Sequence, residues 1–194
     1  MNKTLVLVLA STALAVSACK KNDSETSAST ANQDVAVADN GATSNDMAAA
    51  TALPTTAPEF VNAAAASDRF EIESSKLAKA SGSSAAIKSF ADQMITAHTA
   101  TSAKLKSTVA AMTPALTPND TLNADQQALM SGLQGKTGAE LDSAYKDAQV
   151  TAHQKTLDML NAYASGGDNP QLQALAKGMI PTVTAHLNLA KGLK

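Results

Sequence analysis

The stretch LQALAKGMIPTVTAHLNLAKGL, residues 172–193, carries the clearest structural pattern in the chain. Its apolar residues recur every three or four positions, which gathers them on one face of an α-helix. That face comprises Leu172, Leu175, Met179, Val183, His186, Ala190 and Leu193. Asn169 and Pro170, just before the stretch, are residues that commonly begin a helix. The segment is therefore predicted to be an amphipathic helix with one histidine, His186, in the middle of its apolar face.

The same spacing predicts three further long helices, over about residues 58–81, 84–112 and 137–166. Segments that contain glycine or proline separate them: SGSS at 81–84, two prolines at 114 and 118, and the glycine pair at 166 and 167. The short breaks at 81–84 and 166–167 predict two helical hairpins with tight turns.

The connection between the two hairpins, residues 113–137, is long enough to contain a short helix. Asn123 followed by Gln126 has the form of a capping box and predicts a helix over 124–133, which we expect to lie across the bundle. Thr137 with Glu140 repeats this signature at the start of the next helix. The chain is therefore predicted to form an all-α four-helix bundle with a crossover, and the length of the connection leaves the relative direction of the helices that it joins open.

The first 18 residues have the form of a secretory signal peptide, in which Lys3 precedes an uncharged segment too short to span a bilayer. The sequence VSA at 16–18, directly before the only cysteine, Cys19, resembles the lipobox of bacterial lipoproteins. This resemblance implies cleavage before Cys19, diacylglycerol on its thiol and acylation of the new amino terminus. Three acyl chains, palmitate among them, would anchor the chain stably to a membrane. An ordinary signal peptide that leaves a free cysteine is the alternative. Lys20, where aspartate would retain the protein at the inner membrane, favours the outer membrane, facing the periplasm.

Residues 19–57 are predicted to be a disordered tether, because they are rich in Ser, Thr, Ala, Asn and Asp and contain no aromatic residue. The bundle, residues 58–194, follows as the one folded domain. Its twelve basic and twelve acidic residues balance, so it has no basic surface of the kind that nucleic acids require. We therefore expect the membrane as a partner, through the lipid anchor, and no nucleic acid; the sequence identifies no protein partner.

Three histidines are present, and each lies on the apolar face of a different long helix: His98, His153 and His186. The first helix has Glu71 near its middle instead. Counting residues from the two tight turns, at a rise of about 1.5 Å per residue, places all four side chains in the middle third of the bundle. Imidazole binds zinc, copper and iron well. These four residues therefore form a candidate site for one transition-metal ion, although the domain is large enough to fold without a cofactor.

Four segments of residues 59–194 resemble domain-of-unknown-function family 4142, bacterial envelope proteins grouped with the ferritin-like bundles. They are EFVNAAAASDRFEIESSKLA from residue 59, IKSFADQMITAHTATSAKL from 87, YKDAQVTAHQKTLDML from 145 and the opening stretch from 172. The chain departs from this resemblance at Ala97, where such proteins commonly have aspartate before the histidine. The resemblance implies a ferritin-like bundle, but it implies no activity.

A ferritin-like di-iron site is not expected, because it needs Glu-x-x-His on two helices. Ile95 and Val183 occupy the positions three before two of the histidines. The chain also lacks the common sequence motifs of hydrolases, metalloproteases and nucleotide-binding proteins, so no catalytic residue is predicted.

Two functional interpretations follow from these patterns. The first is a lipid-anchored, non-catalytic binding or interaction module of the cell envelope, in which the histidines are structural. The second is a mononuclear metal-binding protein that uses Glu71, His98, His153 and His186. A pH sensor based on the histidines is a further alternative.

Overall fold

Five α-helices form the described part of the chain, residues 52–194 of a computed structural model. They are α1 (Ala57–Ser81), α2 (Ala85–Ala110), α3 (Ala124–Leu133), α4 (Gly138–Gly166) and α5 (Pro170–Gly192). The predicted all-α bundle with a short extra helix in the crossover is thus confirmed. The predicted signal peptide, Cys19 and most of the predicted tether lie outside the described residues. Within residues 52–194, no helix combines the length and the apolar character that a membrane span requires.

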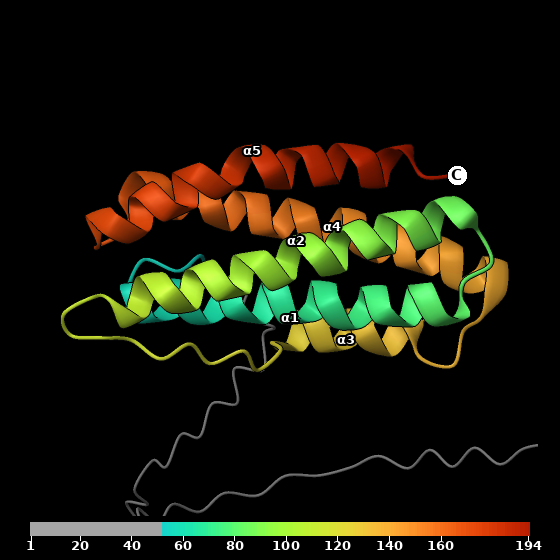
Figure 1. Cartoon of the computed structure of the whole chain (residues 1–194), viewed down its shortest axis with the longest axis horizontal. Helices are drawn as coiled ribbons and strands as arrows, with labels where there is room; N and C mark the ends of the chain where they lie inside the picture. Colours follow the sequence, from blue (N-terminus) through green and yellow to red (C-terminus); the bar gives the residue numbers. More distant parts are fainter. Residues whose placement is uncertain (1–51) are drawn as a thin grey trace, which may run out of the picture. The chain divides into compact units, whose positions relative to one another are not determined.

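The four long helices form two antiparallel hairpins, α1 with α2 and α4 with α5, which pack together mainly through α1 and α4. Figure 1 shows that the crossover returns along α1 before α4 begins, so that α2 and α4 run in the same direction. The sequence left this direction open. The short helix α3 lies lengthwise beside α1 and not across the bundle, which corrects the expected orientation (Figure 1).

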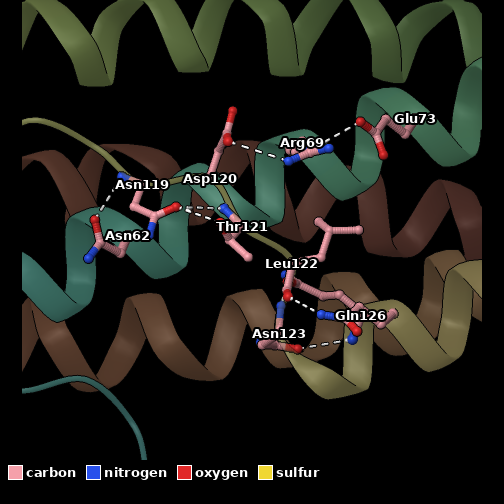
Figure 2. Close-up of polar contacts among 10 residues, drawn as sticks. Asn62, Arg69, Glu73, Asn119, Asp120, Thr121, Leu122, Asn123 and Gln126 are labelled. Carbon is pink, nitrogen blue, oxygen red and sulfur yellow. Dashed lines mark hydrogen bonds and ion pairs between the residues drawn. The ribbon is translucent and has the colours of Figure 1, made fainter.

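Polar contacts hold the crossover against the outer side of α1 (Figure 2). The backbone N–H of Asn119 donates to Oδ1 of Asn62 at 2.9 Å, and Arg69 lies 3.5 Å from a carboxylate oxygen of Asp120. The predicted capping box then opens α3, since Asn123 and Gln126 exchange hydrogen bonds of 2.9 and 3.0 Å. These contacts fix the return path of the chain and so explain why α3 runs along α1.

The second predicted capping box, Thr137 with Glu140, is wrong. The side chain of Thr137 makes no capping hydrogen bond in the described structure. Glu140 instead accepts from the ammonium group of Lys136, just before the helix. The spacing of the two residues fits a capping box, but the nearby lysine offers the carboxylate a stronger, charge-assisted partner.

One carboxylate sets the height of the first hairpin against α4. Asp142, near the start of α4, accepts from the backbone N–H groups of Ser83 (3.1 Å) and Ser84 (2.8 Å) in the turn between α1 and α2. A Cβ atom at Gly82 would lie 2.5 Å from Oδ1 of Asp142, so this close approach requires glycine. Because α2 and α4 are tied at this end, the residues farther along them keep a fixed relative height.

A polar layer divides the core of the bundle into two apolar clusters. One cluster gathers around the stacked rings of Phe60 and Tyr163, whose centroids lie 4.1 Å apart. The other gathers around Phe90 and Tyr145. Three buried polar residues stand between the members of these two clusters along their helices: Asp68 on α1, His98 on α2 and His153 on α4. Glu71 on α1 and Gln149 on α4 are buried close to them in sequence. Buried polar side chains are costly unless they are paired, so this layer is where a function is to be sought.

Candidate metal centre

The three histidines meet in the polar layer, from three different helices: His98 from α2, His153 from α4 and His186 from α5. Their ring centroids are 5.6 to 5.7 Å apart, and one nitrogen from each ring lies within 4.8 Å of the other two. His98 and His153 are buried, with 6% and 1% of their surface exposed, and His186 is half-buried. The three histidines therefore lie at one height along the bundle, as the counting of residues from the turns predicted.

Hydrogen bonds fix the orientation of two of the rings. Nδ1 of His153 donates to the backbone carbonyl of Gln149 at 3.0 Å, and Nδ1 of His98 donates to Oδ1 of Asp68 at 2.8 Å. A carbonyl or a carboxylate can only accept, so Nδ1 carries a proton in both rings, and in the neutral form of each ring the lone pair is on Nε2. Metal-binding histidines typically have this arrangement, with the second nitrogen donating to a carboxylate or a carbonyl.

Three buried imidazole nitrogens have no hydrogen-bond partner among the described residues: Nε2 of His98, Nε2 of His153 and Nδ1 of His186. Each ring thus offers one nitrogen that the protein does not use. Three histidines that each have an unpaired nitrogen, and that offer one nitrogen each within 4.8 Å of one another, form a donor set that suits a borderline divalent ion.

Asp68 belongs to the candidate site and was not predicted from the sequence. It is 2% exposed, and its second carboxylate oxygen accepts from the hydroxyl of Ser102 at 3.1 Å. Its position three residues before Glu71 put it on the same side of α1. The spacing would have identified Asp68 as a site residue if a broad buried face had been predicted for α1.

Glu71 lies beside the three histidines but faces a different nitrogen. Its Oε1 is 3.4 Å from Nδ1 of His153, the nitrogen that already donates to Gln149. Among the described residues, Glu71 has no hydrogen bond or ion pair with the unpaired Nε2 of this ring. The residue is 1% exposed, and neither carboxylate oxygen has a hydrogen-bond partner in residues 52–194. The structure therefore brings three of the four predicted ligands together and places Glu71 next to them.

Burial sets the charges in this layer. Burial and the positive charge of His98 together lower the pKa of His153 to about 3, against the opposite effect of the bond to Gln149. Burial and His98 likewise lower the pKa of His186 to about 4. For His98 burial also lowers the pKa, but the bond to Asp68 and the charge of Glu71 outweigh it, so the net shift is upward. His153 and His186 are consequently neutral at pH 7, the form in which imidazole binds metals.

The pKa of Glu71 is shifted in the direction that favours its neutral form. Burial raises it to about 7, against the influence of His98 and Gln149, and the charge of Asp68 raises it as well. The buried carboxyl group of Glu71, which has no hydrogen-bond partner, is therefore mainly neutral only below about pH 7 in the metal-free protein.

Comparison with known proteins places this geometry in context. The sequence model of the family described as "Domain of unknown function (DUF4142)" matches residues 42–193. No curated protein sequence matches the chain. Among solved structures, one described as "CopM in the Cu(II)-bound form" has a similar fold, with a TM-score of 0.59 and 13% sequence identity. The similarity covers 71% of this chain and 94% of the other, and at this identity it establishes the fold alone.

Proposed function

Because the chain belongs to the DUF4142 family, whose description assigns no activity, we propose a function from its own residues: it binds one Cu(II) ion through His98, His153 and His186. The observation that carries this proposal is that each of three histidines, from three helices, has a buried, unpaired nitrogen, and that the three rings offer one nitrogen each within 4.8 Å of one another. Leaving three such nitrogens unpaired destabilises a protein unless they bind something.

The donor set supports copper more than other ions. Three nitrogens and no thiolate suit copper and zinc, and in a site of this kind Cu(II) binds more tightly than the other divalent metals of the first row. The similar fold of CopM, whose solved structure is a Cu(II)-bound form, adds support. Small ring rotations would bring the nitrogens from within 4.8 Å to the separation of roughly 3.4 Å that bond lengths near 2.0 Å require.

Two buried carboxylates near the histidines support a positively charged ligand. Asp68 is bonded to His98 at 2.8 Å, and Glu71 lies 3.4 Å from His153. Both are at most 2% exposed, so water does not compensate their charge. A divalent cation bound to the three histidines would compensate this charge, because each carboxylate contacts one of the rings that would hold it.

The experiment that tests the proposal is a metal titration of the full chain, produced without a polyhistidine tag. After challenge with Cu(II) or Zn(II) and removal of loosely bound metal, we expect one copper per chain by elemental analysis. The electron paramagnetic resonance spectrum should show coupling to nitrogen. Substoichiometric copper, or a spectrum without nitrogen coupling, would favour the alternative in which the histidines form a structural polar cluster of a binding module.

We predict that Asp68→Asn weakens Cu(II) binding by roughly 10- to 100-fold, the usual effect of removing the carboxylate behind a metal-bound histidine. The amide still accepts from His98, so the ring keeps its place, but the negative charge that makes it a better ligand is gone. Competition titration against a chelator of known affinity measures the change. Asp92→Asn, which removes an exposed carboxylate paired with Lys79, is the control and should leave the affinity unchanged.

We further propose, from the sequence of residues 1–20, that the protein is anchored by lipid at Cys19 to the outer membrane and faces the periplasm. Copper binding in the periplasm would not compete with the thiols of the cytosol. We predict that the wild-type chain incorporates labelled palmitate and sediments with membranes, whereas Cys19→Ala does neither. A Cys19→Ala chain that remains on membranes would contradict the anchor without affecting the metal proposal.

A further inference from the structure

A cleft between α2 and α5 reaches the histidines from the surface. It has a volume of about 210 Å³, and both His98 and His186 line it. Exposed residues form its two rims, Ala100 and Lys104 on α2 and Gly178 and Thr182 on α5. Its floor comes from α1 and α4. We call this feature the α2–α5 cleft.

Small residues on the two rims keep the cleft open. Ala100 has only a methyl group, and a Cβ atom built at Gly178 would meet no described atom within 4 Å. No close contact therefore requires glycine at this position, and its effect is to leave space at the entrance. A larger side chain at Gly178 would have room to project over the cleft without displacing its neighbours.

The walls of the cleft suit a small, mainly apolar molecule. Its inner lining is largely aliphatic and includes Ala64, Leu105, Leu175 and Val183. A dry cavity of about 150 Å³ is large enough to bind benzene, so about 210 Å³ accommodates a single aromatic ring with one substituent.

The charges around the cleft favour an anion. Lys104 lines the rim, and its ammonium group forms no ion pair within residues 52–194. Asp68 also lines the cleft, but its two oxygens already accept from His98 and Ser102. Imidazole binds a metal ion as a neutral ligand, so a divalent ion held by three imidazole nitrogens keeps its charge and has a position open to an anionic ligand.

We propose that the α2–α5 cleft binds a small organic anion of about the size of benzoate, with its carboxylate on the metal ion and its ring against the aliphatic walls. This inference rests on the proposed copper site. Lys104 attracts the anion to the entrance, and the open rims at Ala100 and Gly178 admit it. The residues of the cleft thus select a ligand by its single negative charge and by a ring-sized apolar body.

The test uses the full chain loaded with one Cu(II), titrated with benzoate and, separately, with azide. Azide is small enough to reach any open coordination position. We expect both to change the visible and electron paramagnetic resonance spectra, with benzoate saturating at about 1 mM or below, as suits a ligand of this size. A chain that takes up no copper overturns both proposals. Copper uptake with a response to azide and none to benzoate overturns only the cleft proposal.

Variants at the two rims locate the binding. Gly178→Phe should weaken benzoate binding at least about 10-fold and leave copper stoichiometry unchanged, because the new ring covers the entrance. Ala100→Phe closes the cleft from the other rim and should act in the same way. Gly192→Phe is the matched control, since this glycine lies on the same helix, meets no atom within 4 Å in the described structure and does not line the cleft. Benzoate binding that survives both rim variants would overturn the proposal.

A variant that removes the charge of Lys104 tests whether the cleft recognises the negative charge of the ligand separately from its apolar ring. Lys104→Gln should weaken benzoate binding by about 3-fold or more and leave the binding of the neutral 4-methylpyridine unchanged. Lys106→Gln, an exposed lysine two residues away, is the control. Equal losses for both probes would show that Lys104 does not select the anion.

Discussion

His153→Leu is expected to abolish stoichiometric Cu(II) binding while the bundle stays folded. Structural metal sites with four ligands bind with about 10 to 16 kcal/mol, so one ligand accounts for roughly 3 kcal/mol, or a factor of 100 to 1,000 in affinity. His153 contributes an unpaired nitrogen from the most buried of the three rings. Competition with a chelator, followed by elemental analysis, measures the loss.

The fold of this variant is expected to survive because the substitution removes an unsatisfied polar atom from the core. Leucine has a similar volume, and the only hydrogen bond that it removes is the one from Nδ1 to the carbonyl of Gln149. That carbonyl lies inside α4 and also accepts a backbone hydrogen bond of the helix, so it keeps a partner. Circular dichroism and urea unfolding without metal check this point. His186→Leu tests the same prediction at a half-buried position, and Gln154→Leu, next to His153 but exposed, is the control. Wild-type copper affinity in both histidine variants would refute the proposed site.

Glu71→Gln is expected to stabilise the metal-free protein at pH 8 by roughly 3 kcal/mol. The native pKa of about 7 lies well above the ordinary value of 4.5 because the buried carboxylate has no partner, and each pKa unit corresponds to about 1.4 kcal/mol. The stabilising contribution of the neutral acid is complete below pH 4.5 and is lost as the pH rises through about 7. Glutamine stays neutral throughout, so the free energy of unfolding of the variant increasingly exceeds that of the wild type over this pH range.

The measurement is urea unfolding in the presence of a chelator at pH 4.5, 6 and 8. The difference between variant and wild type should be close to zero at pH 4.5 and largest at pH 8, since the histidines titrate in both proteins. Glu73→Gln is the control: this carboxylate lies on the same helix but is 39% exposed and paired with Arg69. A difference that does not change with pH would show that Glu71 is not held near neutrality in the folded state.

The helices and the height of the histidines were predictable because both depend on local chemistry. Proline and glycine mark the helix ends, and the rise per residue of an α-helix is fixed, so counting from the turns at Gly82 and Gly167 placed His98, His153 and His186 at one level. The structure has the two turns close to those residues, and one nitrogen of each ring lies within 4.8 Å of the other two.

The lateral arrangement was not predictable, because it depends on which helices become neighbours. The length of the crossover permits either direction of α4, and contacts such as Asn119 with Asn62 decide it only in the folded chain. For the same reason Asp68 was missed: α1 touches α2, α3 and α4, so it buries a wider face than the periodicity of one stripe indicates. Glu71 was chosen from its central position, and only the structure shows which nitrogen of His153 it faces.

The tie between Asp142 and the α1–α2 turn holds the two hairpins together at one end of the bundle, whereas the candidate ligands join them near the middle. At the opposite end, the backbone N–H of Asp168 donates to the carbonyl of Thr55 at 3.2 Å, and Phe60 stacks on Tyr163. Copper held by His98 of one hairpin and by His153 and His186 of the other would add a connection between these two ends. Loss of the ion would then leave both ends joined and weaken the contact between the hairpins at the middle of the bundle.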